Sequence, residues 1–284
     1  MTRRLDPDAT MGEARALAEA GDHAAALRLW ELLARAGHAR AQNNIGACFA
    51  EGLGVARDPA LAVRWLTLSA EASDPVGQRN LAALLFKGEG VAQDDARALA
   101  LYRQAAEQGD APAQDMLSWM LLEHRQDAGH RRDPAEALVW AERAARQGVP
   151  SAMTRIGMLY HDAVGVPRDP ARAAAWWRCG AERGDADGQA MLGAALVLGS
   201  GVGRDPEAGL AWLLRAQGGG SGLAGRFVAA ARNALDAEAQ ERARAVASAA
   251  ARAGLPAPVS PLPEAGPASA AEAPSPQRRS GEAR

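Results

Sequence analysis

The chain repeats one short pattern at a nearly constant interval, and this interval limits its possible folds more than any other feature. A small residue follows Ile or Leu at five places, which are Ile45-Gly46, Leu81-Ala82, Leu117-Ser118, Ile156-Gly157 and Leu192-Gly193. Successive copies lie 36, 36, 39 and 36 residues apart. A fixed period of this size is typical of stacked supersecondary units, not of one closed globule.

Each repeat has the pattern of two helices joined by a glycine turn. In the clearest copy, the apolar residues of 42–51 recur at helical spacing, which predicts the first helix. Gly52 then provides a left-handed stop, and Asp58-Pro59 predicts the cap and first position of the second helix. One slot of the second helix is predicted to be core, and it holds Trp65, Trp140, Trp176 and Trp212.

Composition supports an all-helical chain and excludes some partners. Alanine is abundant, and it is the best helix former. The net charge of −2 provides no basic excess for phosphates, so we expect no nucleic-acid partner. The longest apolar run, 190–198, is too short to span a membrane.

The repeats lie between two different chain ends. We expect an N-terminal capping helix pair over 1–40, C-terminal capping helices over 223–254 and a disordered tail, rich in Pro, Ala and Ser, over 255–284. The third repeat replaces the glycine turn by a longer polar loop over 123–132, whose role the sequence leaves open. The five expected repeats are 41–76, 77–112, 113–151, 152–187 and 188–222.

Together these motifs resemble those of the Sel-one-like repeat (SLR) family, a relative of tetratricopeptide repeats. The resemblance covers roughly residues 22–222 and is specific, because Gly-x-Gly-Val, Asp-Pro, Ala and Trp recur in register. It implies an all-α, right-handed α/α superhelical solenoid, here of about six helix pairs with a C-terminal capping helix and a disordered tail. It also implies a scaffold or adaptor that binds other proteins. Some secreted members are disulfide-rich and bind β-lactams, but their paired cysteines are missing here.

The sequence offers no constellation of catalytic, metal-binding or cofactor-binding residues. His124 and His130 are the only close pair of histidines, and no cysteine and carboxylate complete a metal site beside them. The repeated aspartates are predicted to be helix caps. Cys48 and Cys179 lie on different repeats, so we expect no disulfide and a reducing compartment. No signal peptide is visible, so the expected location is the cytoplasm, in a bacterium by composition.

The first helices are expected to line the concave side of the solenoid and to present a partner-binding face. Asparagines there could hydrogen-bond a peptide backbone, and Arg79, Lys87 and Arg155 could meet a carboxylate. Exposed aromatic residues and methionines often mark an interaction surface, although Phe86 and Trp119 could instead fill the core. The candidate partner-binding residues are Asn43, Asn44, Arg79, Asn80, Phe86, Lys87, Met116, Trp119, Arg155, Met158 and His161.

The leading hypothesis is therefore a non-catalytic adaptor that holds a peptide or a partner domain in a concave groove. One alternative is a secreted-type hydrolase or β-lactam-binding repeat protein. Another is a self-assembling structural module, because the sequence does not decide the oligomeric state.

Overall fold

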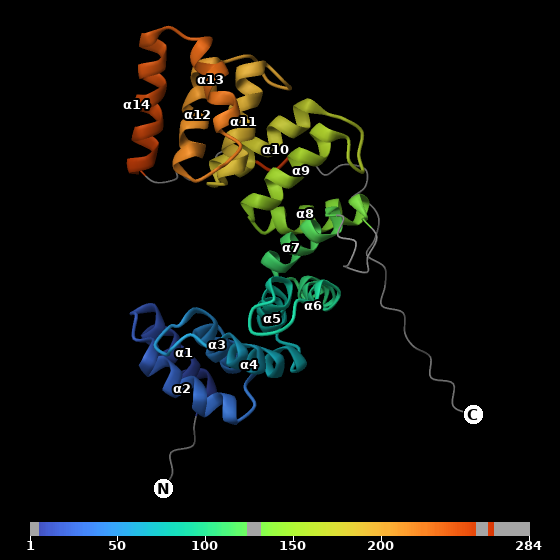
Figure 1. Ribbon diagram of the computed structural model, residues 1–284, viewed down its shortest axis with the longest axis vertical. Helices are drawn as coiled ribbons and strands as arrows, with labels where there is room; N and C mark the ends of the chain where they lie inside the picture. Colours follow the sequence, from blue (N-terminus) through green and yellow to red (C-terminus); the bar gives the residue numbers. More distant parts are fainter. Residues whose placement is uncertain (1–5, 124–131, 254–260, 264–284) are drawn as a thin grey trace, which may run out of the picture. The chain divides into compact units, whose positions relative to one another are not determined.

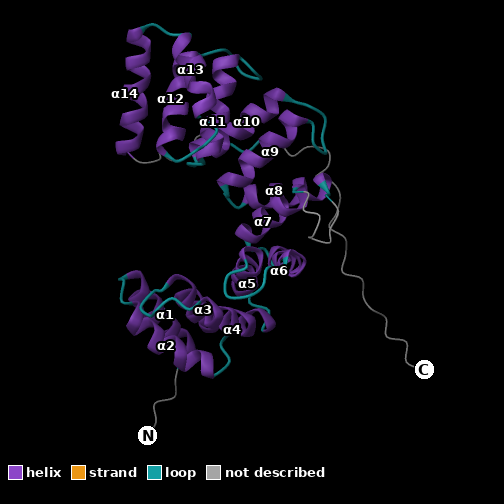
Figure 2. Ribbon diagram, viewed as in Figure 1, coloured by secondary structure: helices purple, strands orange, loops and turns teal. Residues whose placement is uncertain are grey.

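The computed structural model describes residues 6–123, 132–253 and 261–263, and these residues form fourteen helices and no strand (Figures 1 and 2). The all-α repeat fold expected from the sequence is therefore confirmed. The chain divides into two compact units, Met1–Asp133 and Pro134–Arg284. Most of the irregular 123–132 loop, with His124 and His130, and most of the 255–284 tail lie outside the described residues.

The described residues of unit 1 form seven helices, and each helix packs against the next along the chain. The first helices of two successive repeats, α3 and α5, also touch directly, so these helices lie side by side. The helices are α1 (Pro7–Glu19), α2 (His23–Arg35), α3 (Ala39–Glu51), α4 (Pro59–Glu71), α5 (Pro75–Lys87), α6 (Asp95–Glu107) and α7 (Ala111–Leu122).

Unit 2 continues the same arrangement and ends with extra helices. Its first helices α9 and α11 touch, while α14 packs on α12. Asp236 caps α14, because its carboxylate accepts a hydrogen bond from the Ala239 amide at 2.8 Å. The helices are α8 (Pro134–Arg146), α9 (Pro150–Asp162), α10 (Pro170–Glu182), α11 (Ala186–Leu198), α12 (Pro206–Gly218), α13 (Gly225–Asn233) and α14 (Ala237–Ala253).

The small residue of each first helix allows the second helix to approach closely. A Cβ atom added to Gly46 would lie 2.7 Å from Leu66 Cγ, and one added to Gly157 would lie 2.5 Å from Trp177 Nε1. The space therefore belongs to the large side chain of the facing helix. The eighth residue of the second helix fills it, since Leu66, Trp177 and Leu213 are all buried.

The cap aspartates of the second helices occupy their expected places. Asp58, Asp94, Asp169 and Asp205 each accept a hydrogen bond from an amide in the first turn of α4, α6, α10 and α12. The tryptophan slot is less uniform than the sequence suggests. Trp140 and Trp176 are buried, whereas Trp65 and Trp212 are half-buried.

Two features of the first helices differ from the sequence expectation. Helix α3 begins at Ala39 rather than at residue 42, and each expected repeat start lies two residues inside a first helix. In addition, α5, α7 and α11 have aspartate caps of their own, Asp74, Asp110 and Asp185. Each of these aspartates lies only a few residues after the end of the preceding second helix. The sequence pattern alone therefore assigns them to the turn between the helices and not to a cap.

The turn after α9 contains a strained residue at a position that is glycine in other repeats, so it tests whether this position requires glycine. Ala163 adopts φ 56°, in the left-handed region, where Gly52, Gly88 and Gly199 stand in the other repeats. This conformation costs a non-glycine residue about 1–2 kcal/mol of conformational free energy. We expect Ala163→Gly to raise the free energy of unfolding by about 1 kcal/mol, measured by urea titration with circular dichroism.

The matched control for Ala163→Gly is Ala230→Gly, at an exposed site within α13. That change should lower stability by about 1 kcal/mol, as glycine does inside helices. Equal losses from both substitutions would contradict the strain at Ala163.

Candidate partner-binding face

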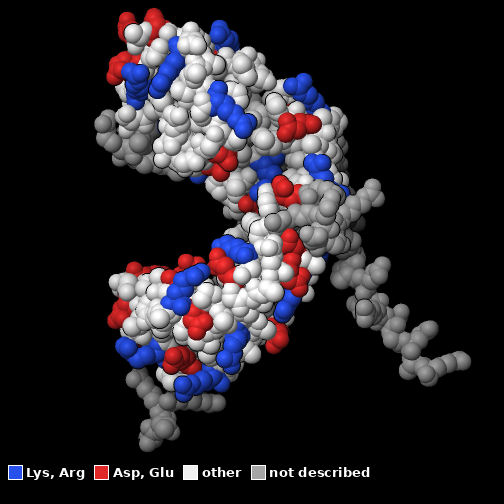
Figure 3. Space-filling view, viewed as in Figure 1, with Lys and Arg blue, Asp and Glu red and all other residues white. Residues whose placement is uncertain are grey.

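The first helices place the predicted residues in two separate groups. Unit 1 holds eight of them: Asn43 and Asn44 on α3, Arg79, Asn80, Phe86 and Lys87 on α5, and Met116 and Trp119 on α7. Unit 2 holds Arg155, Met158 and His161 on α9. In Figure 3, basic and acidic side chains are interspersed over the visible face of each unit. We describe the two groups separately.

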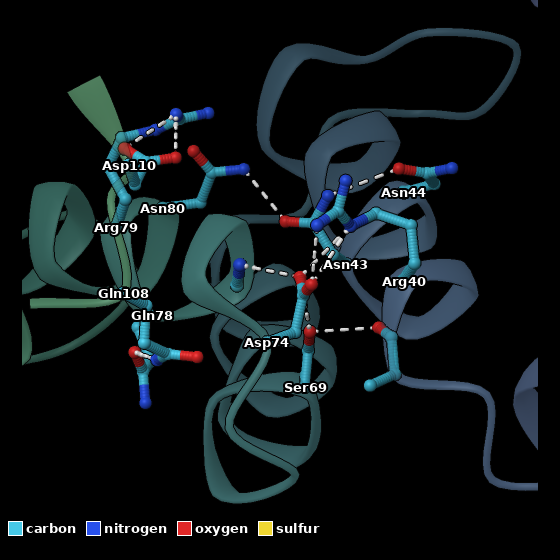
Figure 4. Close-up of polar contacts among 12 residues, drawn as sticks. Arg40, Asn43, Asn44, Ser69, Asp74, Gln78, Arg79, Asn80, Gln108 and Asp110 are labelled. Carbon is cyan, nitrogen blue, oxygen red and sulfur yellow. Dashed lines mark hydrogen bonds and ion pairs between the residues drawn. The ribbon is translucent and has the colours of Figure 1, made fainter. Parts of the chain in front are cut away.

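The asparagines of unit 1 join neighbouring helices. Asn80 Nδ2 donates a hydrogen bond to Asn43 Oδ1 at 2.8 Å, which connects α5 to α3 (Figure 4). Asn43 Nδ2 lies 3.1 Å from the Asn44 side-chain amide. With its oxygen toward Trp30, that amide accepts a hydrogen bond from the indole Nε1 at 3.3 Å. Asn43 is only 4% exposed, so it supports Asn80 and presents little surface to a partner.

Two arginines of the same face bind buried carboxylates of the chain itself. Arg40 Nη2 lies 2.6 Å from Asp74 Oδ1, and Arg79 Nη1 lies 2.7 Å from Asp110 Oδ2 (Figure 4). Each carboxylate also accepts the amide hydrogen bond that caps the next first helix, from Gly77 and Ala113 respectively, both at 2.9 Å. Arg79 therefore meets an internal carboxylate, the one that caps α7.

Unit 2 has a similar contact in which an uncharged residue replaces the arginine. Thr154 stands at the helix position of Asn43 and Arg79, and its hydroxyl donates to Asp185 Oδ2 at 2.6 Å. The same carboxylate oxygen accepts the Gly188 amide at 2.7 Å. In each unit, the fifth residue of one first helix, Arg79 of α5 or Thr154 of α9, binds the cap aspartate of the next first helix, whereas in α3 the second residue, Arg40, makes this contact. The sequence reasoning missed Arg40, Asp74, Asp110 and Asp185, although an aspartate before each of α5, α7 and α11 was a visible signal.

The apolar part of the unit 1 face is a pair of aromatic rings shared between two repeats. Phe86 on α5 and Trp119 on α7 meet edge to face, with ring centroids 5.5 Å apart and an angle of 85°. Both side chains are half-buried, as is Met116 one turn before Trp119, and Lys87 is exposed. We call Phe86, Lys87, Met116 and Trp119 the aromatic face. Aromatic residues are enriched at protein interfaces relative to the rest of the surface.

The unit 2 residues have a different environment. The His161 ring lies 5.4 Å from the Trp177 ring, and its Nδ1 lies 2.7 Å from Asp162 Oδ1. Arg155, Met158 and His161 are half-buried. Among the described residues, no three His, Cys, Asp or Glu side chains gather in a way that could hold a metal ion.

Unit 1 also has a hollow of about 730 Å³ near its N-terminal end. Apolar atoms of Met11, Trp30 and Leu53 contribute to its lining, and Arg15 and Arg40 contribute charge. Cys48 borders it as well, but burial raises the pKa of this thiol, which makes it a poor nucleophile near neutral pH. Asn44 belongs to this lining, so the hollow extends the predicted face toward the N-terminus.

In the part of the chain that the structure describes, no helix has both the length and the apolar character needed to cross a membrane.

Comparison with known proteins identifies the repeated unit. Six stretches match the Sel1 repeat, at residues 17–38, 39–74, 75–110, 111–149, 150–185 and 186–216. A solved Sel1 repeat protein from Oxalobacter formigenes is 27% identical, covering 84% of this chain and 95% of its own, with a TM-score of 0.74.

Other solved structures are more distant. A protective antigen of uropathogenic Escherichia coli with an SLR fold is 22% identical over 86% of this chain and 68% of its own, with a TM-score of 0.42. An immunity protein from Pseudomonas aeruginosa is 18% identical over 87% of this chain and 83% of its own, with a TM-score of 0.46. No curated protein matches the sequence significantly.

Proposed function

The chain belongs to the Sel1 repeat family, and we propose that it is a non-catalytic adaptor whose aromatic face binds a peptide or a partner domain. Proteins of this family generally act as protein-interaction scaffolds. The observation that carries the proposal is the half-buried Phe86–Trp119 pair, which is contributed by two repeats and left partly open.

The chemistry of the aromatic face favours a partner with an apolar side chain next to an acidic group. An aromatic pair supplies a rigid apolar surface at little cost in conformational entropy. Lys87, the only lysine in the chain, lies next to Phe86 and is exposed. Asn80 lies on the same helix and is half-buried, so one edge of its amide can meet a peptide backbone.

Two further observations support a binding role over an enzymatic one. The repeated aspartates of the second helices are used as caps, and both cysteines are free and buried. Free cysteines also fit a reducing compartment, so we propose that the protein works in the cytoplasm without metal, cofactor or nucleic acid. The disulfide-rich hydrolase or β-lactam-binding alternative would need chemistry that these cysteines do not supply.

The test is quantitative affinity capture with the full chain and a Phe86→Ala/Trp119→Ala variant. We expect the double variant to lose a specific partner by about tenfold or more, because aromatic residues dominate such interfaces. The affinity of the purified partner should then fall by a similar factor in calorimetry.

The matched control is Leu32→Ala/Leu68→Ala, which removes two apolar side chains from second helices of the same unit. These residues are 50% and 47% exposed. Equal capture by the aromatic variant and the unchanged chain would contradict the proposal. Concentration-dependent light scattering that the aromatic variant abolishes would instead support self-assembly through this face.

A further inference from the structure

One position on the second helices is unexpectedly covered in unit 2. The tenth residue of α2, α4 and α6 points outward, since Leu32 and Leu68 are 50% and 47% exposed and Gln104 is exposed too. Cys179 is the tenth residue of α10, yet it is only 1% exposed. This position is open in α2, α4 and α6, half-buried at Arg143 of α8 and Arg215 of α12, and fully covered only in α10.

The cover is the short described segment beyond α14, residues 261–263. The Cys179 thiol donates a hydrogen bond to the Pro261 carbonyl oxygen, with Sγ and O 3.3 Å apart. Leu262 and Pro263 are half-buried. Figure 1 shows this segment as the short red stretch beside α10.

The surface under the segment is formed by small side chains, which leave room for proline rings. Ala171 and Ala175 of α10, with Gly201 and Val202 of the next repeat's turn, line a hollow of about 280 Å³ that Pro261 and Pro263 also border. Proline lacks an amide hydrogen and has a fixed φ, so only the Leu262 amide of the Pro-Leu-Pro segment needs a hydrogen-bond partner, and the segment loses little entropy on binding. Such segments bind in shallow apolar grooves by the same logic.

The neighbouring second helix is covered in a related way. Helix α14 packs on α12, where Arg242 Nη2 lies 2.7 Å from Glu207 Oε2 and Ala211 is 5% exposed. Glu207 and Ala211 stand at the helix positions that Ala171 and Ala175 occupy in α10. Sequence beyond the last repeat therefore covers the outer faces of two successive second helices.

We propose that the outer face of α10, with the turn before α12, is a binding surface for an extended proline-containing segment, and that residues 261–263 are its intramolecular occupant. The tether raises the local concentration of this segment, so a contact of three residues suffices to keep the surface filled and yet reversible. The inference is independent of the aromatic face, which lies in unit 1.

The test uses the two native cysteines of the full chain as reporters. Residues 261–263 are replaced in Pro261→Ser/Leu262→Ser/Pro263→Ser, and N-ethylmaleimide labelling of each cysteine is followed by mass spectrometry. Cys179 should label about tenfold faster or more, because protection follows the free energy of opening. Loss of the cover also removes the burial that raises the Cys179 pKa, which increases the reactive thiolate fraction near neutral pH.

Three controls separate detachment from unfolding. Cys48, buried in unit 1, should keep its labelling rate. Pro274→Ser/Pro276→Ser, a change of similar chemistry elsewhere in the sequence, should leave both cysteines unchanged. A synthetic peptide of residues 256–266, added to the triple variant, should slow Cys179 labelling saturably.

Equal Cys179 labelling in the triple variant and the unchanged chain would overturn the proposal. The proposal would also be overturned if the peptide failed to slow Cys179 labelling in the triple variant. This holds whether or not Cys48 labelling rises as well.

Discussion

Trp177→Ala should lower the free energy of unfolding of the chain by about 3–5 kcal/mol, the usual cost of truncating a fully buried aromatic side chain. Trp177 is 2% exposed and fills the space that Gly157 leaves open on α9. Because Gly157 has no side chain, it cannot move in to close the cavity. Urea titration followed by circular dichroism measures the loss.

Two comparisons test whether volume causes the loss at Trp177. Trp212 is half-buried and its ring lies 4.2 Å from the Arg215 guanidinium carbon, so Trp212→Ala should cost only about 1–2 kcal/mol. Trp177 Nε1 has no hydrogen-bond partner among the described residues. Trp177→Phe should therefore lose less than Trp177→Ala, because it retains most of the volume and removes a buried donor. A Trp177→Ala loss no larger than that of Trp212→Ala would contradict this account.

Gly201→Ala is expected to cost about 2–4 kcal/mol through strain and a steric clash together. Gly201 has φ 72°, where an L side chain is strained. An added Cβ would also run into the carbonyl group of Pro170, at the start of the preceding second helix. This neighbour is backbone, so it cannot rotate away as a side chain would.

Gly203→Ala is the matched control, two residues along the same turn. A Cβ at Gly203 meets nothing within 4 Å, and its φ is not positive. We expect its effect to stay within about 0.5 kcal/mol, as for ordinary surface changes. Urea titration of both variants measures the two stability losses. Similar unfolding midpoints for the two variants would contradict the importance of the contact between repeats at Gly201.

The repeated contact at this glycine explains why the fold could be read from the sequence. Gly54 approaches the start of α2, and Gly165 approaches Pro134 of α8, as Gly201 approaches Pro170. The second glycine of each turn thus fixes how one repeat rests on the one before. This constraint recurs in four of the five repeats, at Gly54, Gly90, Gly165 and Gly201, and a residue that recurs in this way is visible without coordinates.

The candidate site was only partly predictable, because its contacts are not marked by the same residue in each repeat. The space beside the small residue is filled by Leu66 in one repeat and by Trp177 in another, so no repeated identity marks it. The sequence placed Phe86 and Trp119 on suitable helices. It did not reveal that they contact each other, or that Arg79 is already bound to Asp110. These are contacts between side chains about 30 residues apart, and periodicity carries no information about them.

The sequence by itself determined the helical repeat, its period, its second-helix caps and its family resemblance, because each depends on local backbone requirements that return every 36 to 39 residues. Only the tertiary structure decided which polar side chains are used inside the chain, which aromatic rings stay partly open, and that Pro261 covers Cys179. Those outcomes depend on which surfaces meet after the helices stack, and the residues that make the contacts differ from one repeat to the next.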